Sequence, residues 1–520
     1  MNYKYESRKL FIASLVSCMI AALLFGLFYS TALYQDVVFI QRLMRISLIL
    51  CIVVFGFSSH FTQKEGSGQL RLEKQVAALL TAIIVMGIIM RIGYMLYTPF
   101  ELRGHDIGLG ACGHADYIIN LIEGRLPDTN RYQFYHPPLF HFLAAALSWL
   151  FHALTGEQDV KILLEAGKLV SCWSSIVTLF LSTALCRELE IGKAGKTMVI
   201  AVSAFLPEHY LLAGRLNNDA LSIMFMTAIV LYTIKWYRRQ SMHDTIMLAL
   251  CYGLGMMTKI SVGTLAPVTG ALMILALYKN LRRGNGTQTF LQYLAFSLIA
   301  FQLGLWYPIR NLIRFGQPLN YVFQQETAGP LYCGDYKVFS RFFSVFDHTL
   351  YADPFSDYKV LPYLVKTSVF GEFKYDVPIW IPQILLICAW ILAAAGLIVM
   401  VGRFICKPSF QDRLLAAFWA AIIASYLWFN VKYPFGCTMD FRYAVPSALI
   451  GSIFLGKWED VKKTGFVEEM AGYMLWISLG MFCLMSCLMY VMIKQLFSWV
   501  KSAREVSEVC SSEVCCFRIP

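Results

Sequence analysis

Apolar segments long enough to cross a membrane recur along almost the whole chain, and they limit the folds that it can adopt. As an α-helix, about twenty residues cross a bilayer and satisfy every backbone amide internally. Of the 520 residues, 58% are apolar and only 15% are charged. We therefore expect an all-α polytopic membrane protein. About thirteen spans are predicted, near residues 10–33, 43–61, 76–97, 169–186, 197–213, 220–236, 245–258, 260–278, 290–308, 379–401, 414–429, 443–456 and 470–493.

Clusters of lysine and arginine indicate which loops face the cytoplasm, because cytoplasmic loops carry an excess of basic residues. The short run 139–151 follows Pro137 and Pro138, and if it does not cross, every predicted inner loop is basic. If it crossed, these clusters would face outward. We therefore predict that it enters the outer interface and returns. Two large outer loops, residues 98–168 and 309–378, follow from this topology.

The net charge and the cysteines point to no further site. The charge of +11 belongs to the inner loops, so we expect no nucleic-acid partner. Most of the fifteen cysteines lie within apolar runs, where they act as small hydrophobic residues. Cys112, Cys333 and Cys437 fall in predicted outer regions and could pair in an oxidising compartment, which their spacing leaves open.

A polar segment from Pro99 to Phe142 interrupts the apolar runs, and function is expected there. It gathers histidine, aspartate, glutamate and arginine, which gain nothing from a bilayer unless they meet water, headgroups or a ligand. Residues 114–124 predict a short surface helix with one polar and one apolar stripe. Glycines on both sides of Asp106 let the backbone turn sharply around it.

Short motifs stand in a fixed order at the outer ends of several predicted spans. They consist of Asp106, Gly124, Leu126, Pro127, Tyr135, His136, Pro137, Pro138 and Leu139, then Asn217, Asn218, Asp219, Thr258, Lys259, Trp306, Arg310, Asn311, Asp440, Arg442, Tyr443 and Pro446. This set, over roughly residues 76–456, resembles the GT-C glycosyltransferases. It is similar to the bacterial relatives of dolichyl-phosphate-mannose protein mannosyltransferases and of the aminoarabinose transferase of lipid A.

The resemblance implies a GT-C fold and an enzyme that moves a sugar from a polyprenyl-phosphate donor to a hydroxyl group outside the cytoplasm. Residues 76–456 would form the catalytic module, residues 1–75 an added pair of spans, and residues 457–520 the last span and tail. Many relatives carry a second carboxylate where this chain has Ile107. A divalent metal is therefore not supported at that position.

The resemblance assigns Asp106 as the general base for the incoming hydroxyl. An aspartate in a glycine-rich loop also caps turns, and this structural role is the alternative. Arg442, Lys259 and Arg310 are the candidates for binding the donor phosphate, since arginine and lysine both bind phosphate oxygens. Their alternative role is to extend toward lipid headgroups at the ends of spans.

Seven further residues are candidates for substrate binding. Asp219 could equally cap a helix, and aromatic residues could anchor the run 139–151 in the interface. The histidines match no compact spacing of metal ligands, so no metal site is predicted. The candidates are His105, Asp116, Tyr135, His136, Asn218, Asp219 and Tyr443.

Two other functions stay open at the sequence level. A transporter or flippase of lipid-linked glycans would also need many spans, but its polar residues would lie at mid-membrane within an internal repeat. An inactive relative that serves as a binding subunit would not need Asp106. We expect the enzyme in the plasma membrane, or in the endoplasmic reticulum of a eukaryote. Protein, lipid and cell-wall glycan are all open as acceptors.

Overall fold

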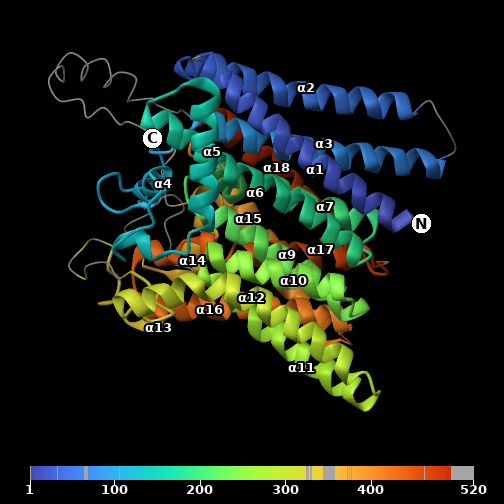
Figure 1. Ribbon diagram of the computed structural model, residues 1–520. Helices are drawn as coiled ribbons and strands as arrows, with labels where there is room; N and C mark the ends of the chain where they lie inside the picture. The colour runs from blue at the N-terminus through green and yellow to red at the C-terminus, as the bar shows by residue number, and fades with distance from the viewer. Residues whose placement is uncertain are drawn as a thin grey trace.

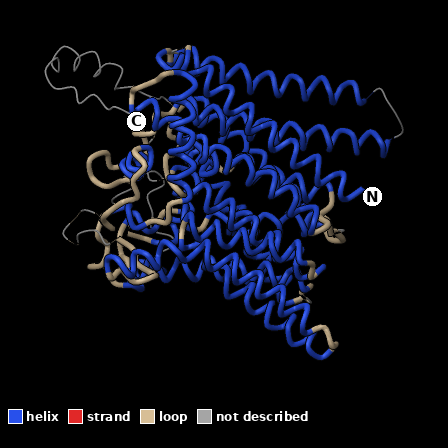
Figure 2. Tube along the Cα trace, in the orientation of Figure 1, coloured by secondary structure: helices blue, strands red, loops and turns tan. Residues whose placement is uncertain are grey.

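The computed structural model describes residues 2–31, 33–63, 68–104, 106–323, 331–343, 358–371, 377–406, 408–461 and 463–493, with 327, 329, 373 and 375. They form α-helices joined by loops and short 3-10 helices (Figure 2). The helices are α1 (Asn2–Ser30), α2 (Val37–Gln63), α3 (Gly68–Tyr97), α4 (His114–Ile122), α5 (Leu139–Thr155), α6 (Val160–Glu188), α7 (Lys193–Phe205), α8 (Pro207–Ala213), α9 (Asp219–Arg239), α10 (Met242–Thr258), α11 (Ala266–Arg282), α12 (Gly286–Phe315), α13 (Val338–Phe343), α14 (Val360–Phe370), α15 (Trp380–Ile405), α16 (Phe410–Lys432), α17 (Val445–Glu459) and α18 (Phe466–Met492).

Within the described residues, ten helical segments are long and apolar enough to cross a bilayer. They are α1, α2, α3, α6, α9, α12, α15, α16, α18 and the segment Ile260–Arg282, which contains α11. The other three predicted spans coincide with α7–α8, α10 and α17, which are shorter. The expected all-α, integral multi-pass membrane architecture is confirmed, whereas the count of thirteen spans is not.

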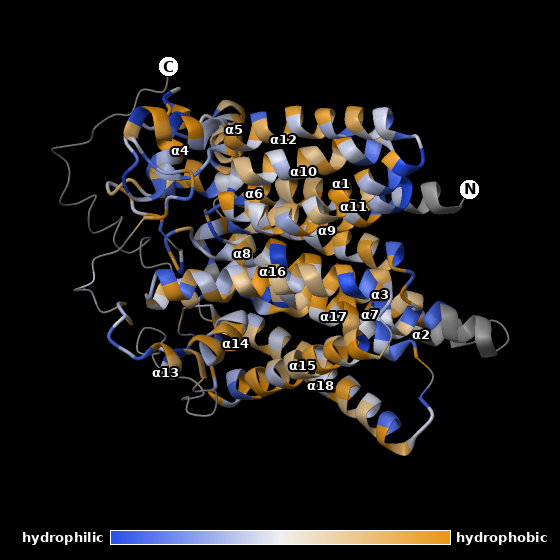
Figure 3. Ribbon diagram, turned by 90° about the horizontal axis from the view of Figure 1, so that it is seen from below, coloured by the Kyte–Doolittle hydropathy of each residue, from blue (hydrophilic) through white to orange (hydrophobic). Residues whose placement is uncertain are grey.

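The connections between the long helices gather at two opposite ends of the bundle. Figure 1 shows α4, α5, α13 and α14 at one end, and the N-terminus and the connection between α11 and α12 at the other. Apolar residues dominate the middle of the helices and hydrophilic residues gather toward their ends (Figure 3). Helix α5 runs across the ends of its neighbours instead of along them (Figure 1), as expected for a segment that does not cross.

A buried arginine supports the break between α7 and α8. Pro207 begins α8 and has no N–H, so the carbonyl of Ser203, four residues earlier, loses its helical donor. Arg91 Nη2 donates to this carbonyl at 2.8 Å, and Nη1 donates to the carbonyl of Ala204 at 3.1 Å. Its Nε donates to the Ser175 hydroxyl at 2.9 Å. Arg91 therefore joins α3, α6 and α7 where the helix is interrupted.

The most enclosed of the ten spans are α6 and α9, in each of which 78% of an 18-residue apolar window is buried. Helix α9 packs against α6 and α10, and α10 packs against α12. The first residue of α9 is Asp219. The middle of the bundle thus presents a buried aspartate at the end where the large loops gather.

Candidate active site

Two buried residues of α6 fix the loop that leaves α3. Lys168 Nζ donates to the carbonyls of Met95 at 2.7 Å and Thr98 at 2.6 Å, which supplies donors for the end of α3. Glu165 forms an ion pair with Lys168 and accepts the backbone N–H of Phe100 at 2.9 Å. The chain is therefore anchored before it reaches Asp106.

The loop around Asp106 folds back onto the start of α4. The carbonyls of Asp106 and Ile107 accept the N–H groups of His114 and Ala115 at 3.0 and 3.1 Å, so they cap the helix through the backbone. A Cβ at Gly113 would lie 2.0 Å from the Ile107 carbonyl oxygen, so this close approach requires glycine. Asp106 itself has a φ of 58°, a left-handed conformation held by these contacts.

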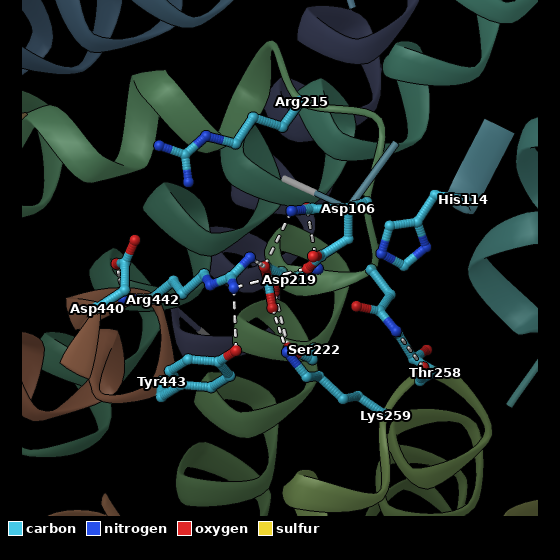
Figure 4. Close-up of polar contacts among 12 residues, drawn as sticks. Asp106, His114, Arg215, Asp219, Ser222, Thr258, Lys259, Asp440, Arg442 and Tyr443 are labelled. Atoms are coloured by element: carbon cyan, nitrogen blue, oxygen red, sulfur yellow. Dashed lines mark hydrogen bonds and ion pairs between the residues drawn. The ribbon is translucent and has the colours of Figure 1, made fainter. Parts of the chain in front are cut away.

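Four charged side chains from separate segments meet beside this loop (Figure 4). Arg442 lies in the 3-10 helix η6 (Phe441–Tyr443), and its Nη2 is 3.7 Å from Asp106 Oδ2. Its Nη1 is 3.5 Å from Oδ2 of Asp219 at the start of α9. Lys259, between α10 and the 3-10 helix η3 (Ile260–Leu265), pairs with the other oxygen of Asp219. Arg442 therefore bridges two carboxylates.

The turn that carries Arg442 is held from three directions. Asp440 caps it, because its side chain accepts the N–H of Arg442 at 2.8 Å. Burial raises the pKa of Asp440, while Arg442 acts in the opposite direction. Tyr426 of α16 donates to the carbonyl of Met439 at 2.6 Å, and Thr367 of α14 accepts the N–H of Phe441 at 2.9 Å. The second large loop thus supports the site through α14.

The two carboxylates differ in accessibility. The Asp219 side chain is 3% exposed and, besides its ion pairs, accepts an N–H of Asn217 at 2.9 Å. The Asp106 side chain is 25% exposed, and its Oδ1 accepts the Tyr132 hydroxyl at 2.9 Å. Burial and the neighbouring Asp106 carboxylate raise the pKa of Tyr132, so its hydroxyl stays protonated. Asp106 is the carboxylate that a bound molecule can reach.

A cavity of about 390 Å³ opens beside the charged cluster. The four charged side chains are among the residues that line it. Residues of η3 and α16 line it as well, and the hydroxyls of Thr264 and Ser425 are 3.3 Å apart there. Its apolar wall includes Met226, Ile422 and Trp428, and Trp428 is 68% exposed on the outside of the bundle. The cavity is therefore lined by both charged and apolar side chains.

Three buried histidines lie next to Asp106. His114 Nδ1 and His141 Nε2 are 2.9 Å apart, and the His114 ring also stacks on His136. Burial lowers the pKa of His114 to about 4, although the carboxylates of Asp106 and Asp219 act in the opposite direction. Burial likewise lowers the pKa of His136 and His141. The three imidazoles are therefore neutral at neutral pH.

The structure brings most of the predicted site residues together. Those that line the cavity are Asp106, Tyr135, His136, Asn218, Asp219, Lys259, Arg442 and Tyr443. Arg310 does not line it, and donates instead to the Pro127 carbonyl at 2.6 Å. Asp116 is also outside it, and accepts the N–H groups of Gly110 and Cys112. His105 lies outside the described residues.

Several cavity residues were missing from the predicted site. They are chiefly Tyr132, His114, Gln317 and Lys432. Lys432, a basic residue at the outer end of a predicted span, departs from the positive-inside pattern and could have been singled out on that ground. Gln317 carries no such signal, because its place in the cavity depends on where α12 ends.

Fold and site define a class: a multi-pass membrane protein with a charged cavity at one end of its helices. Within the part of the chain that the structure describes, no group of three or more His, Cys, Asp or Glu side chains is arranged to hold a metal ion. The roles of the individual site residues stay predictions.

Comparison with known proteins adds a family similarity. Residues 135–307, about a third of the chain, match the family model for dolichyl-phosphate-mannose-protein mannosyltransferases. No match was found among curated proteins. The crystal structure of ArnT from Cupriavidus metallidurans in the apo state is 11% identical and matches with a TM-score of 0.48, over 79% of this chain and 75% of that one. The structure of ArnT bound to undecaprenyl phosphate, also 11% identical, matches with a TM-score of 0.46 over 80% and 76%.

Proposed function

We propose that this protein is a GT-C membrane glycosyltransferase that moves a sugar from a polyprenyl-phosphate donor to a hydroxyl acceptor. The family-model match over residues 135–307 supports this class. The observation that carries the proposal is the accessible carboxylate of Asp106 beside Arg442, in a cavity that apolar side chains also line. A lipid-linked sugar needs these three features together.

The donor is proposed to contact both the charged and the apolar residues that line the cavity. Its phosphate would lie against Arg442 and Lys259, which offer a planar guanidinium and a point charge for phosphate oxygens. The polyprenyl chain would lie along the lining residues of η3 and α16, toward the exposed Trp428. The sugar would then lie beside Asp106, because it is joined to the phosphate.

Transfer requires a base but no general acid. Asp106 removes the proton from the acceptor hydroxyl, whose oxygen attacks the anomeric carbon. The bond from that carbon to the phosphate oxygen breaks, and the lipid phosphate leaves with the electron pair as a dianion. Arg442 and Lys259 stabilise the developing charge, and direct attack inverts the anomeric carbon. Asp219 positions both cations through its ion pairs.

The site is proposed to face away from the cytoplasm. The large loops at this end lie opposite the helix ends that carry the basic clusters, such as Lys279, Arg282 and Arg283 at the end of α11. Cytoplasmic loops of membrane proteins are enriched in such residues. The membrane would be the plasma membrane of a bacterium or the endoplasmic reticulum of a eukaryote. A protein, a lipid or a glycan could supply the hydroxyl.

Loss of the base should abolish transfer but not folding. We expect Asp106→Asn to lower kcat for transfer from polyprenyl-phosphate sugars by 100-fold or more, as for removal of a general base. The measurement is product formation by the purified protein with a panel of such donors. Asp128→Asn, at an exposed position in the same loop, is the matched control and should keep wild-type activity.

Full activity of a folded Asp106→Asn protein would refute the role of Asp106. Absence of transfer from every donor by the wild type, together with movement of a lipid-linked sugar across vesicles, would instead favour the transporter. A wild type that only binds donor would indicate an inactive relative.

A further inference from the structure

Gln317 is a buried polar residue that the proposed mechanism does not use. It follows Gly316, whose φ of 64° ends α12, and its N–H donates to the Asn311 carbonyl at 3.4 Å. The residue is 6% exposed and lines the cavity. Its Oε1 is buried and accepts no hydrogen bond from the residues that the structure describes. A buried amide oxygen without a donor is unfavourable, and a bound ligand would satisfy it.

The cavity wall near Asp106 is built from aromatic rings. Tyr132, which donates to Asp106, forms a T-shaped pair with Phe323, with ring centres 5.3 Å apart. Tyr135 meets Tyr321 in the same way, also at 5.3 Å. Both pairs join the 3-10 helix η2 (Tyr132–Tyr135) to the segment that follows Gln317. Rings and amide groups are the side chains with which proteins bind hydroxylated, apolar-faced rings such as sugars.

The charges of the cavity favour an uncharged sugar. The charged side chains that line it, within the described residues, are Asp106, Asp219, Lys259, Lys432 and Arg442. Both carboxylates already face cations, so the surplus of one positive charge suits a lipid phosphate. A sugar with an ammonium group would add a positive charge, and neither carboxylate among the described lining residues is free to pair with it.

We propose that Gln317 is a specificity-determining residue, whose amide oxygen accepts a hydrogen bond from one hydroxyl of the donor sugar. The sugar would sit against the wall formed by Tyr132, Tyr135 and Tyr321. This inference rests on the proposed glycosyltransferase function. It goes beyond it by naming an uncharged, hydroxylated sugar and the residue that reads one of its hydroxyls.

The test compares donors that differ by one hydroxyl. Polyprenyl-phosphate hexoses and their monodeoxy analogues are assayed with the wild type, Gln317→Leu and Gln317→Glu. We expect the wild type to prefer the parent over one deoxy analogue by about 10-fold to 100-fold in kcat/KM. Gln317→Leu should lose that preference, since the site no longer has the acceptor. Gln317→Glu keeps an acceptor and should transfer the analogue with an amino group at that carbon better than the wild type does.

Two outcomes separate this inference from the proposed function. If the wild type transfers hexoses but Gln317→Leu discriminates among the deoxy analogues as the wild type does, Gln317 does not read the sugar and the glycosyltransferase stands. If the wild type transfers no sugar, both fail together. Gln302→Leu, at an exposed position on α12 outside the cavity lining, is the matched control. It should keep the wild-type preference, and thermal midpoints in detergent verify folding of each variant.

Discussion

At the residue scale, the buried histidines next to Asp106 link stability to pH. His114, His136 and His141 lie within one stacked group, and burial lowers the pKa of each below its usual range. The unfolded chain binds protons on these imidazoles below about pH 6.5, whereas the folded chain does not do so until pH is far lower. Above pH 6.5 these histidines therefore do not reduce the stability of the fold. The free energy of unfolding decreases as pH falls from 6.5 to about 4.

We predict that acidification from pH 7 to pH 5 lowers the thermal midpoint of the purified protein. Each histidine that stays neutral in the fold lowers the free energy of unfolding by up to about 2 kcal/mol at pH 5 relative to pH 7. His141→Phe removes one of these groups and keeps a ring to stack on Tyr117, so its midpoint should fall less. Scanning fluorimetry at several pH values measures the difference.

The exposed His243 offers the control for this experiment. It lies at the start of α10, away from the group, with its side chain 77% exposed. The thermal midpoint of His243→Gln should fall between pH 7 and pH 5 by as much as that of the wild type. If the thermal midpoints of His141→Phe and the wild type fell equally, burial of these imidazoles would not be the cause of the pH dependence of stability.

Single residues also mark how far the sequence could predict the site. Asp106, Lys259 and Arg442 stand at span ends within ordered motifs, so their convergence could be predicted from topology and resemblance. Tyr132 and Gln317 could not, because their orientation depends on a 3-10 helix and on a helix end. Arg310 has the same sequence signal as Arg442, yet its guanidinium bonds a loop carbonyl. Position at a span end does not determine which way a side chain points.

At the scale of elements, Arg91 stabilises the helix interruption that separates α7 from α8 within the bundle. It donates to the carbonyls of Ser203 and Ala204, which the break at Pro207 leaves without helical donors. The residue is fully buried. Buried carbonyls without donors each cost about 1–3 kcal/mol.

Arg91→Leu should therefore destabilise the fold strongly. We expect a thermal midpoint lower by several degrees and a smaller monodisperse fraction in size-exclusion chromatography, since two carbonyls lose their donors. Adding Pro207→Ala restores an N–H four residues after Ser203. The double variant should thus be more stable than Arg91→Leu alone. A wild-type midpoint for Arg91→Leu would contradict this account of the break.

The same break explains why the number of spans was harder to predict than the fold. Hydropathy identified a helix for each of the thirteen apolar runs, because long apolar segments can only be helical in lipid. The run 197–213 divides at Pro207, and α10 ends at Thr258 directly before η3. Helices shortened in this way fall below the length that crosses a bilayer without help from neighbours.

At the scale of the whole molecule, the proposed reaction depends on which end of the bundle faces the cytoplasm. The cavity and both large loops share one end, and the basic residues that close α9 and α11 belong to the other. The positive-inside tendency predicts that the basic end faces the cytoplasm. A lipid-linked donor would then be used on the opposite side.

Insertion of a protease recognition site at each end tests this orientation directly. One insertion lies between Arg125 and Leu126, and the other between Gly284 and Asn285, all of them exposed. Protease added to intact spheroplasts should cleave the first protein but not the second, and permeabilised spheroplasts should allow cleavage of both. Each inserted protein must retain donor transfer, which excludes misfolding as the cause of access. The reverse pattern in active proteins would place the cavity on the cytoplasmic side, where the donor would have to be used before any movement across the bilayer.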